Sequence, residues 1–218
     1  MKQIALLCLV VLVGCSGGPP APDWQANAHG ALRAHTAAWL AGRDRVAMHE
    51  LTVARREVAR TGAVEQIARV ELAACAARFA SLESGDCPAF RPLAQDAGMA
   101  ARTYAEYLAG RWQGLDTQLL PAAQQGAVGV GAGDAIALLQ GIDDPLARLV
   151  AAAALLRAGR LPPAGISLAI DTASQQGWRR PLLAWLGLER DRLAAAGDTA
   201  AAAARQRRMD LVSGAAGR

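Results

Sequence analysis

Lysine is nearly absent from this chain of 218 residues: Lys2 stands alone, and every later basic residue apart from three histidines is arginine. Aromatic residues make up only 4% of the chain, and β-branched residues are sparse. The abundant residues are Ala, Leu, Arg, Gln and Glu, which are strong helix formers. The composition therefore predicts an all-α protein. Positive charge carried by arginine beside so much alanine is typical of a biased genome, so we expect no nucleic-acid partner.

Long hydrophobic runs are missing as well. The run from Ile4 to Val13 has ten apolar residues, whereas a helix needs about 20 to cross a bilayer. It follows Lys2 and precedes Gly14, Cys15 and Ser16. A basic residue, a short apolar run and small residues in this order are typical of a secretory signal peptide. Residues 1–14 are therefore expected to be removed.

The end of this run carries a more specific signal. Leu12-Val13-Gly14-Cys15 resembles the lipobox of bacterial lipoproteins. The resemblance implies that Cys15 is acylated, with palmitate among its acyl groups, and becomes the new N-terminus. Because Ser16 rather than Asp follows the cysteine, it also implies anchoring in the outer membrane of a Gram-negative cell, facing the periplasm.

Two further cysteines remain after export, Cys75 and Cys87. An even pair in an oxidising compartment favours a disulfide. A helix that continues to Leu82, followed by a return through Gly85, would bring the two side chains together. The alternative is a pair of buried free thiols.

Segments rich in glycine and proline divide the chain. Residues 15–22 predict a tether between the lipid and the folded part. Helical hairpins are expected at 23–125 and 135–213, with a glycine-rich hinge at 126–134 and a frayed tail at 214–218. Apolar spacing and stop signals predict helices at 24–41, 45–60, 63–82, 93–109, 134–140, 145–158, 163–176, 181–196 and 199–213, with a shorter apolar piece at 112–123. Asp23, Asp134, Asp144, and either Asp198 or Thr199 are expected to cap the helices that follow them.

A short element recurs along the chain, in which a helix stops at a glycine and a new helix follows. Its glycines are Gly42, Gly110, Gly159 and Gly197. After the first of them, Ala47, Leu51 and Ala54 resemble the second helix of a tetratricopeptide (TPR) hairpin. The resemblance implies stacked antiparallel helical hairpins in a TPR-like right-handed α-α superhelix. The glycines are unevenly spaced, so whether the hairpins are true tetratricopeptide repeats stays open.

Catalytic and metal-binding patterns are weak. His29, His35 and His49 lack the spacing of a zinc helix, so no metal is expected. The glycines from Gly129 to Gly133 favour a hinge over a nucleotide-binding loop, and the serines lack a nucleophile-elbow setting. We therefore expect no cofactor and no enzymatic activity. A catalytic role for His35, His49 or Glu50 is a third, weaker hypothesis.

The residues Trp178, Arg179, Arg180 and Trp185 are the best candidates for a partner surface, because Trp and Arg carry much of the binding energy at interfaces. The function expected first is a protein-binding helical scaffold or envelope assembly factor with another envelope protein as its partner. The alternative is an envelope ligand carrier, or an accessory to a peptidoglycan enzyme, with a cavity between hairpins. A smooth concave face would favour the scaffold, and a large apolar pocket would favour the carrier.

Overall fold

The computed structural model describes residues 22–83 and 86–214, and every regular element in these ranges is a helix. In chain order the elements are α1 (Asp23–Leu40), α2 (Asp44–Ala59), α3 (Val64–Phe79), η1 (Arg91–Leu93), α4 (Met99–Leu108), η2 (Thr117–Leu119), α5 (Ala122–Gln125), α6 (Ala135–Gln140), α7 (Pro145–Arg157), α8 (Pro163–Gln175), α9 (Arg179–Ala195) and α10 (Thr199–Ser213). Four predicted features lie outside the described residues: the signal peptide, the lipidation of Cys15, most of the tether and nearly all of the tail. No helix among the described residues is long and apolar enough to cross a membrane.

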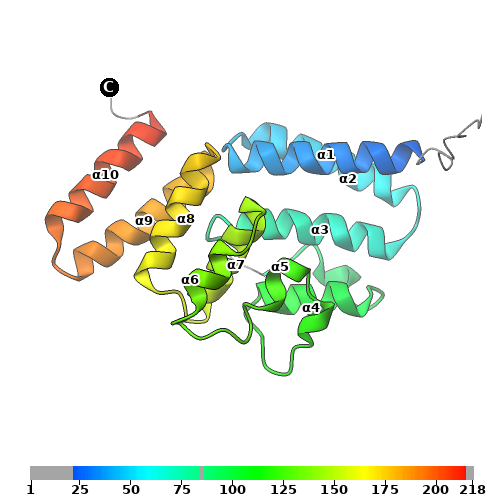
Figure 1. Cartoon of the computed structure of the whole chain (residues 1–218). Helices are drawn as coiled ribbons and strands as arrows, with labels where there is room; N and C mark the ends of the chain where they lie inside the picture. Colours follow the sequence, from blue (N-terminus) through cyan, green and yellow to red (C-terminus); the bar gives the residue numbers. More distant parts are fainter. Residues whose placement is uncertain (1–21, 84–85, 215–218) are drawn as a thin grey trace, which may run out of the picture.

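The helices form stacked hairpins (Figure 1). α1 and α2 pair at one end of the molecule, with α3 beneath them, and α8, α9 and α10 stand at the other end. α4 and α5 lie below α3 in this view, and α7 packs against α3, α5, α6 and α8 and so links the two ends. The predicted all-α class and its antiparallel hairpins are therefore confirmed.

The glycines of the recurring element end helices as expected. Gly42, Gly110, Gly159 and Gly197 have positive φ angles of 77°, 79°, 67° and 81°, a backbone conformation that strongly favours glycine. The element is incomplete after Gly110, where the chain turns again at Gly114 and makes only the short η2 before α5. The apolar piece predicted at 112–123 is thus replaced by turns, η2 and the start of α5, whereas the helix predicted at 134–140 is present as α6.

Helix ends differ from the prediction where the backbone turns early. α3 stops at Phe79, and Leu82 has a left-handed φ of 61° instead of continuing the helix. α4 begins only at Met99, because η1 and the turns that follow it occupy the expected first turns. Asp23 lies in the first turn of α1 and does not cap it, and the side chain of Asp134 makes no capping hydrogen bond at the start of α6.

Two of the predicted caps are confirmed. The carboxylate of Asp144 accepts a hydrogen bond from the backbone N–H of Ala147, at 2.6 Å, at the start of α7. Asp198 accepts one from the N–H of Ala201, at 3.0 Å, at the start of α10. Each satisfies a backbone donor that the first helical turn leaves free.

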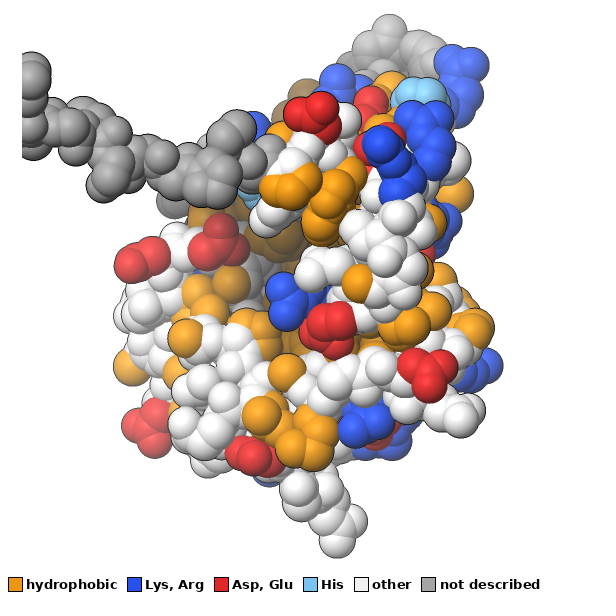
Figure 2. All heavy atoms as spheres, turned by 90° about the vertical axis from the view of Figure 1, so that its right-hand side faces the viewer, with side chains coloured by type: hydrophobic (Ala, Val, Ile, Leu, Met, Phe, Trp, Pro, Cys, Tyr) orange, Lys and Arg blue, Asp and Glu red, His pale blue; other side chains and the backbone are white. Residues whose placement is uncertain are grey.

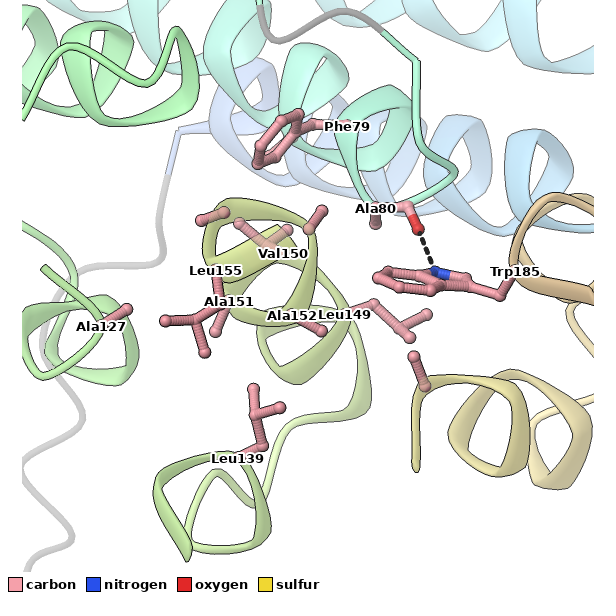
Figure 3. Packing of buried hydrophobic residues seen from close by; sticks show 14 of the residues in the cluster. Phe79, Ala80, Ala127, Leu139, Leu149, Val150, Ala151, Ala152, Leu155 and Trp185 are labelled. Carbon is pink, nitrogen blue, oxygen red and sulfur yellow. Dashed lines mark hydrogen bonds between the residues drawn. The ribbon is translucent and has the colours of Figure 1, made fainter. Parts of the chain in front are cut away.

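The largest core cluster is built mainly from alanine and leucine, with α7 at its centre (Figure 3). Seven consecutive residues of α7, from Leu149 to Leu155, are buried. Trp185 of α9 packs into the same cluster, and its indole N–H donates to the carbonyl oxygen of Ala80, at 3.1 Å. Because the cluster includes Ala127 as well as residues on both sides of it, one core runs past the glycine-rich segment.

The predicted disulfide is confirmed. Cys75 in α3 and Cys87 in the following loop are bonded, with their Cα atoms 5.7 Å apart. The bond holds the segment between α3 and α4 against α3, next to a small cluster that includes Leu72 and Phe90. It therefore helps to fix where α4 begins.

Candidate functional site

The described residues enclose a groove of about 980 Å³ between α1, α3, α4, α5 and α7. α3 packs against α1 on one side and against α4 and α7 on the other, whereas α1 shares no extensive contact with α4 or α7. The space left between these helices is the groove. Its volume lies near the upper end of the range typical of small-molecule sites, about 300–1,000 Å³.

Most of the groove wall is apolar. Leu32 and Leu40 come from α1, Leu72 from α3, Leu120 from the segment before α5 and Val150 from α7. Alanines from α1, α3, α4, α5 and α7 fill the positions between them, and their small side chains leave the hollow open. An elongated apolar ligand would therefore meet hydrocarbon on several sides.

The wall opposite α1 is held in place by Gln124 of α5. Its side-chain oxygen accepts a hydrogen bond from the Tyr107 hydroxyl of α4, at 2.8 Å. Its amide nitrogen donates to the carbonyl oxygen of Ala147 in α7, at 3.0 Å. Because Gln124 is buried and both bonds are made, the residue joins α4, α5 and α7 into one wall.

Charged residues gather at one end of the groove. α1 and α3 run parallel, since two hairpin turns separate them. α1 contributes His29, Leu32 and Arg33 and then Thr36, Ala37 and Leu40, whereas α3 contributes Glu65 and Arg69 and then Leu72, Ala73 and Ala76. The first turn of α4 lies at the same end, because the backbone N–H of Gly98 donates to Glu65, at 3.0 Å.

Figure 2 looks onto the end of the molecule at which α1 begins. It shows a hollow with hydrophobic side chains in its walls and charged side chains around it. The opposite end of the groove is lined by Asp144, Gln176 and Trp178. Polarity in the groove therefore changes along its length, from the charged end through an apolar section to a far end that carries Asp144 and Gln176 beside Trp178.

Most charges of the groove already have partners. Glu65 pairs with Arg69, at 3.2 Å, and also accepts the Gly98 N–H, while Asp144 caps α7. Arg33 is exposed and makes no hydrogen bond or ion pair with any residue that the structure describes. Among the charged side chains that line the groove, its guanidinium is thus the one available to a ligand.

Tyr104 supplies a second polar group, from α4. Its hydroxyl has no hydrogen-bond partner within residues 22–83 and 86–214, and its ring stacks against Tyr107 at 6.1 Å between centroids. Burial raises the pKa of Tyr104, so the phenol stays protonated at neutral pH. It can therefore donate a hydrogen bond to a ligand in the groove.

The predicted partner surface is not one surface. Trp185 is 0% exposed, and its ring fills the core, so its assignment to a surface is wrong. Trp178 is half-buried and lines the same end of the groove as Asp144 and Gln176. Arg179 is exposed and donates to the carbonyl oxygen of Ser213, at 3.4 Å.

Arg180 has a structural role that the sequence did not indicate. Its guanidinium carbon lies 4.0 Å from the centre of the Trp39 ring, and its Nε donates to the Trp39 carbonyl oxygen, at 2.8 Å. It also pairs with Asp44 at the start of α2. The side chain therefore joins α9 to the hairpin of α1 and α2 through cation–π and charged contacts.

The histidines are dispersed. His35 is buried, with its Nδ1 atom 2.7 Å from the carbonyl oxygen of Ala47, and burial lowers its pKa. His49 is exposed on α2, and neither His35 nor His49 lines the groove. The described residues hold no group of three or more His, Cys, Asp or Glu side chains arranged to bind a metal.

Sequence reasoning found Trp178 but missed Arg33, Leu72 and Tyr104 as groove residues. The apolar lining residues have the same helical spacing as core residues, so periodicity cannot separate the two. Arg33 gave one weak signal, as the one arginine in the alanine-rich stretch from Ala28 to Leu40.

In comparisons with known proteins, no protein-family model, no curated protein and no solved structure matches the chain.

Proposed function

We propose that this protein is a membrane-anchored, periplasm-facing lipoprotein that carries an apolar ligand in the groove between α1, α3, α4, α5 and α7. The observation behind the proposal is the groove itself, an apolar hollow of about 980 Å³ with two polar side chains, Arg33 and Tyr104, that lack partners among the described residues. Ligand sites typically combine an apolar wall with a few polar groups that orient the ligand.

The scaffold hypothesis is the less favoured one. A scaffold that binds a protein along its surface would present a smooth concave face. Here α1 stands apart from α4 and α7, and the three helices border a hollow above α3. The carrier hypothesis explains why these helices are lined with alanine, since larger side chains would close the space.

Binding of an uncharged fluorescent probe, N-phenylnaphthylamine, tests the proposal. Its emission rises in apolar surroundings, so we expect a saturable increase with the purified protein. Ala37→Phe places a ring in the groove and should weaken probe binding. Ala26→Phe is the matched control, because Ala26 is exposed on the same helix but does not line the groove.

Probe binding that is absent, or equal in the two variants, would contradict the carrier proposal.

The anchor is tested separately by the intact mass of the protein purified from membranes. A mass that corresponds to a chain starting at Cys15 plus acyl groups, and that is lost in Cys15→Ala, is expected. An unmodified chain would refute the anchor but leave the groove unaffected.

A further inference from the structure

We infer that the ligand of the groove is an acyl chain that ends in an anionic headgroup, with the headgroup at Arg33 and the chain along the apolar section. The inference rests on the proposed carrier function and names the class of ligand. Two observations support it: the charge left without a partner and the direction in which polarity changes.

The first observation concerns charge. Four charged side chains line the groove: Arg33, Glu65, Arg69 and Asp144. Glu65 and Arg69 pair with each other, and Asp144 accepts a backbone hydrogen bond. Arg33 alone makes no such contact with the described residues, so the charge that the groove offers is positive. A guanidinium binds a carboxylate or a phosphate through two N–H groups.

The second observation is that polarity changes along the groove and not across it. An amphipathic helix lying in a groove needs apolar contact along its whole length and polar contact along both rims. The wall from α3 changes from Glu65 and Arg69 to Leu72, Ala73 and Ala76, and the wall from α1 passes from Arg33 through Thr36 to Ala37 and Leu40. An amphiphile with its headgroup at Arg33 and its chain along these aliphatic residues has the same order. At the far end the carboxylate of Asp144 already caps α7, so it offers no cation site there.

The size of the apolar section agrees with an acyl chain. Arg33 and Leu40 are seven residues apart on α1, which is about 10 Å along the helix axis. Arg69 and Ala76 have the same separation on α3, and both pairs line the groove. Val150 and Trp178 extend the apolar wall further. Tyr104 offers a hydrogen-bond donor within the groove for an oxygen atom of the ligand.

Three single-chain amphiphiles of equal length test the inference: dodecanoate, dodecanol and dodecyltrimethylammonium. Each is used below its micelle-forming concentration, or for dodecanol below its solubility limit, to displace N-phenylnaphthylamine from the Cys15→Ala protein, in which no attached acyl group can compete. We expect dodecanoate to bind about fivefold more tightly than dodecanol, as for a partly exposed ion pair. The ammonium compound should bind most weakly.

Arg33→Gln should remove the preference for dodecanoate while leaving dodecanol binding unchanged. Arg45→Gln is the matched control, because Arg45 is an exposed arginine of α2 that does not line the groove. This variant should keep the full preference.

Equal affinity for the three amphiphiles, or a preference that survives Arg33→Gln, would overturn the inference and leave the carrier function intact. Displacement of the probe by an acidic amphipathic peptide but not by dodecanoate would also overturn it, and would indicate a protein partner. Failure of the probe itself to bind would instead overturn the carrier function.

Discussion

α7 and α10 are both rich in alanine, yet one is the most buried helix of the molecule and the other is mostly accessible. α7 contains Leu149 to Leu155, all buried, and packs against four other helices. In α10 only Ala202 is buried, and the helix packs mainly against α9. In both helices alanine lets a neighbouring helix approach closely. In α7, however, the leucines and the valine also supply the apolar surface area whose burial is favourable.

α10 is instead held largely by polar contacts. Arg205 pairs with the buried Glu189 of α9, at 2.6 Å, and Gln206 accepts a hydrogen bond from Arg190, at 2.7 Å. Arg208 donates to Ser174 of α8, at 3.1 Å. Apolar contacts from Met209 and Val212 add to these. The comparison shows that alanine content alone does not predict burial, because neighbouring side chains decide it.

The largest expected effect compares a leucine from each helix. Leu155→Ala in α7 should lower the free energy of unfolding by about 3 kcal/mol, because it leaves a cavity at a fully buried position. Leu211→Ala in α10 should change it by less than about 0.5 kcal/mol, because Leu211 is 69% exposed. Urea unfolding followed by circular dichroism measures both. Similar losses would mean that α10 is buried against something outside this chain.

A second pair of variants tests the polar attachment of α10. Arg205→Ala leaves the carboxylate of Glu189 buried with only a long contact to Ser167, at 3.4 Å. We expect a loss of about 2 kcal/mol from the unpaired charge. Arg207→Ala is the control, since Arg207 is exposed, and its effect should stay within about 0.5 kcal/mol. If both losses are small, apolar contacts rather than the ion pair hold α10.

The fold was predictable where local chemistry decides it. The stops at Gly42, Gly159 and Gly197 follow from a backbone conformation that glycine adopts most easily. The cap at Asp144 and the disulfide of Cys75 follow from equally local rules and from the inferred compartment. These features depend on residues close together in sequence.

The groove was not predictable, because it depends on helices that are distant in sequence. Leu72 and Tyr104 become groove residues only because α1 stands apart from α4 and α7. Trp178 and Trp185 were assigned to one surface, yet they lie at different depths: about two turns of α9 separate the half-buried residue from the fully buried one. Pattern alone does not indicate which face of a helix meets a neighbour and which meets a hollow.

The glycine turns that follow α1 and α9, at the two ends of the molecule, can be compared in the same way. Gly42 and Gly197 have positive φ, and no atom lies within 4 Å of a Cβ added at either position. Gly42→Val and Gly197→Val should therefore each cost about 1–2 kcal/mol through backbone strain alone. Gly129→Ala, at a position without positive φ, should have little effect. Unequal costs at the two turns would show that tertiary packing contributes as well.

The smallest expected effect concerns the buried polar residue of the first hairpin, His35. Burial lowers its pKa below the ordinary value of 6.5, so the unfolded chain binds a proton at a pH where the folded chain does not. This stabilising contribution is present above about pH 6.5 and is lost as the pH falls below it. The free energy of unfolding should therefore fall as the pH is lowered from 7 to 5.5, measured by urea unfolding at several pH values. His35→Gln should remove this component, whereas His49→Gln should keep it, since His49 is exposed on the next helix. An unchanged pH profile in His35→Gln would assign the effect to other groups.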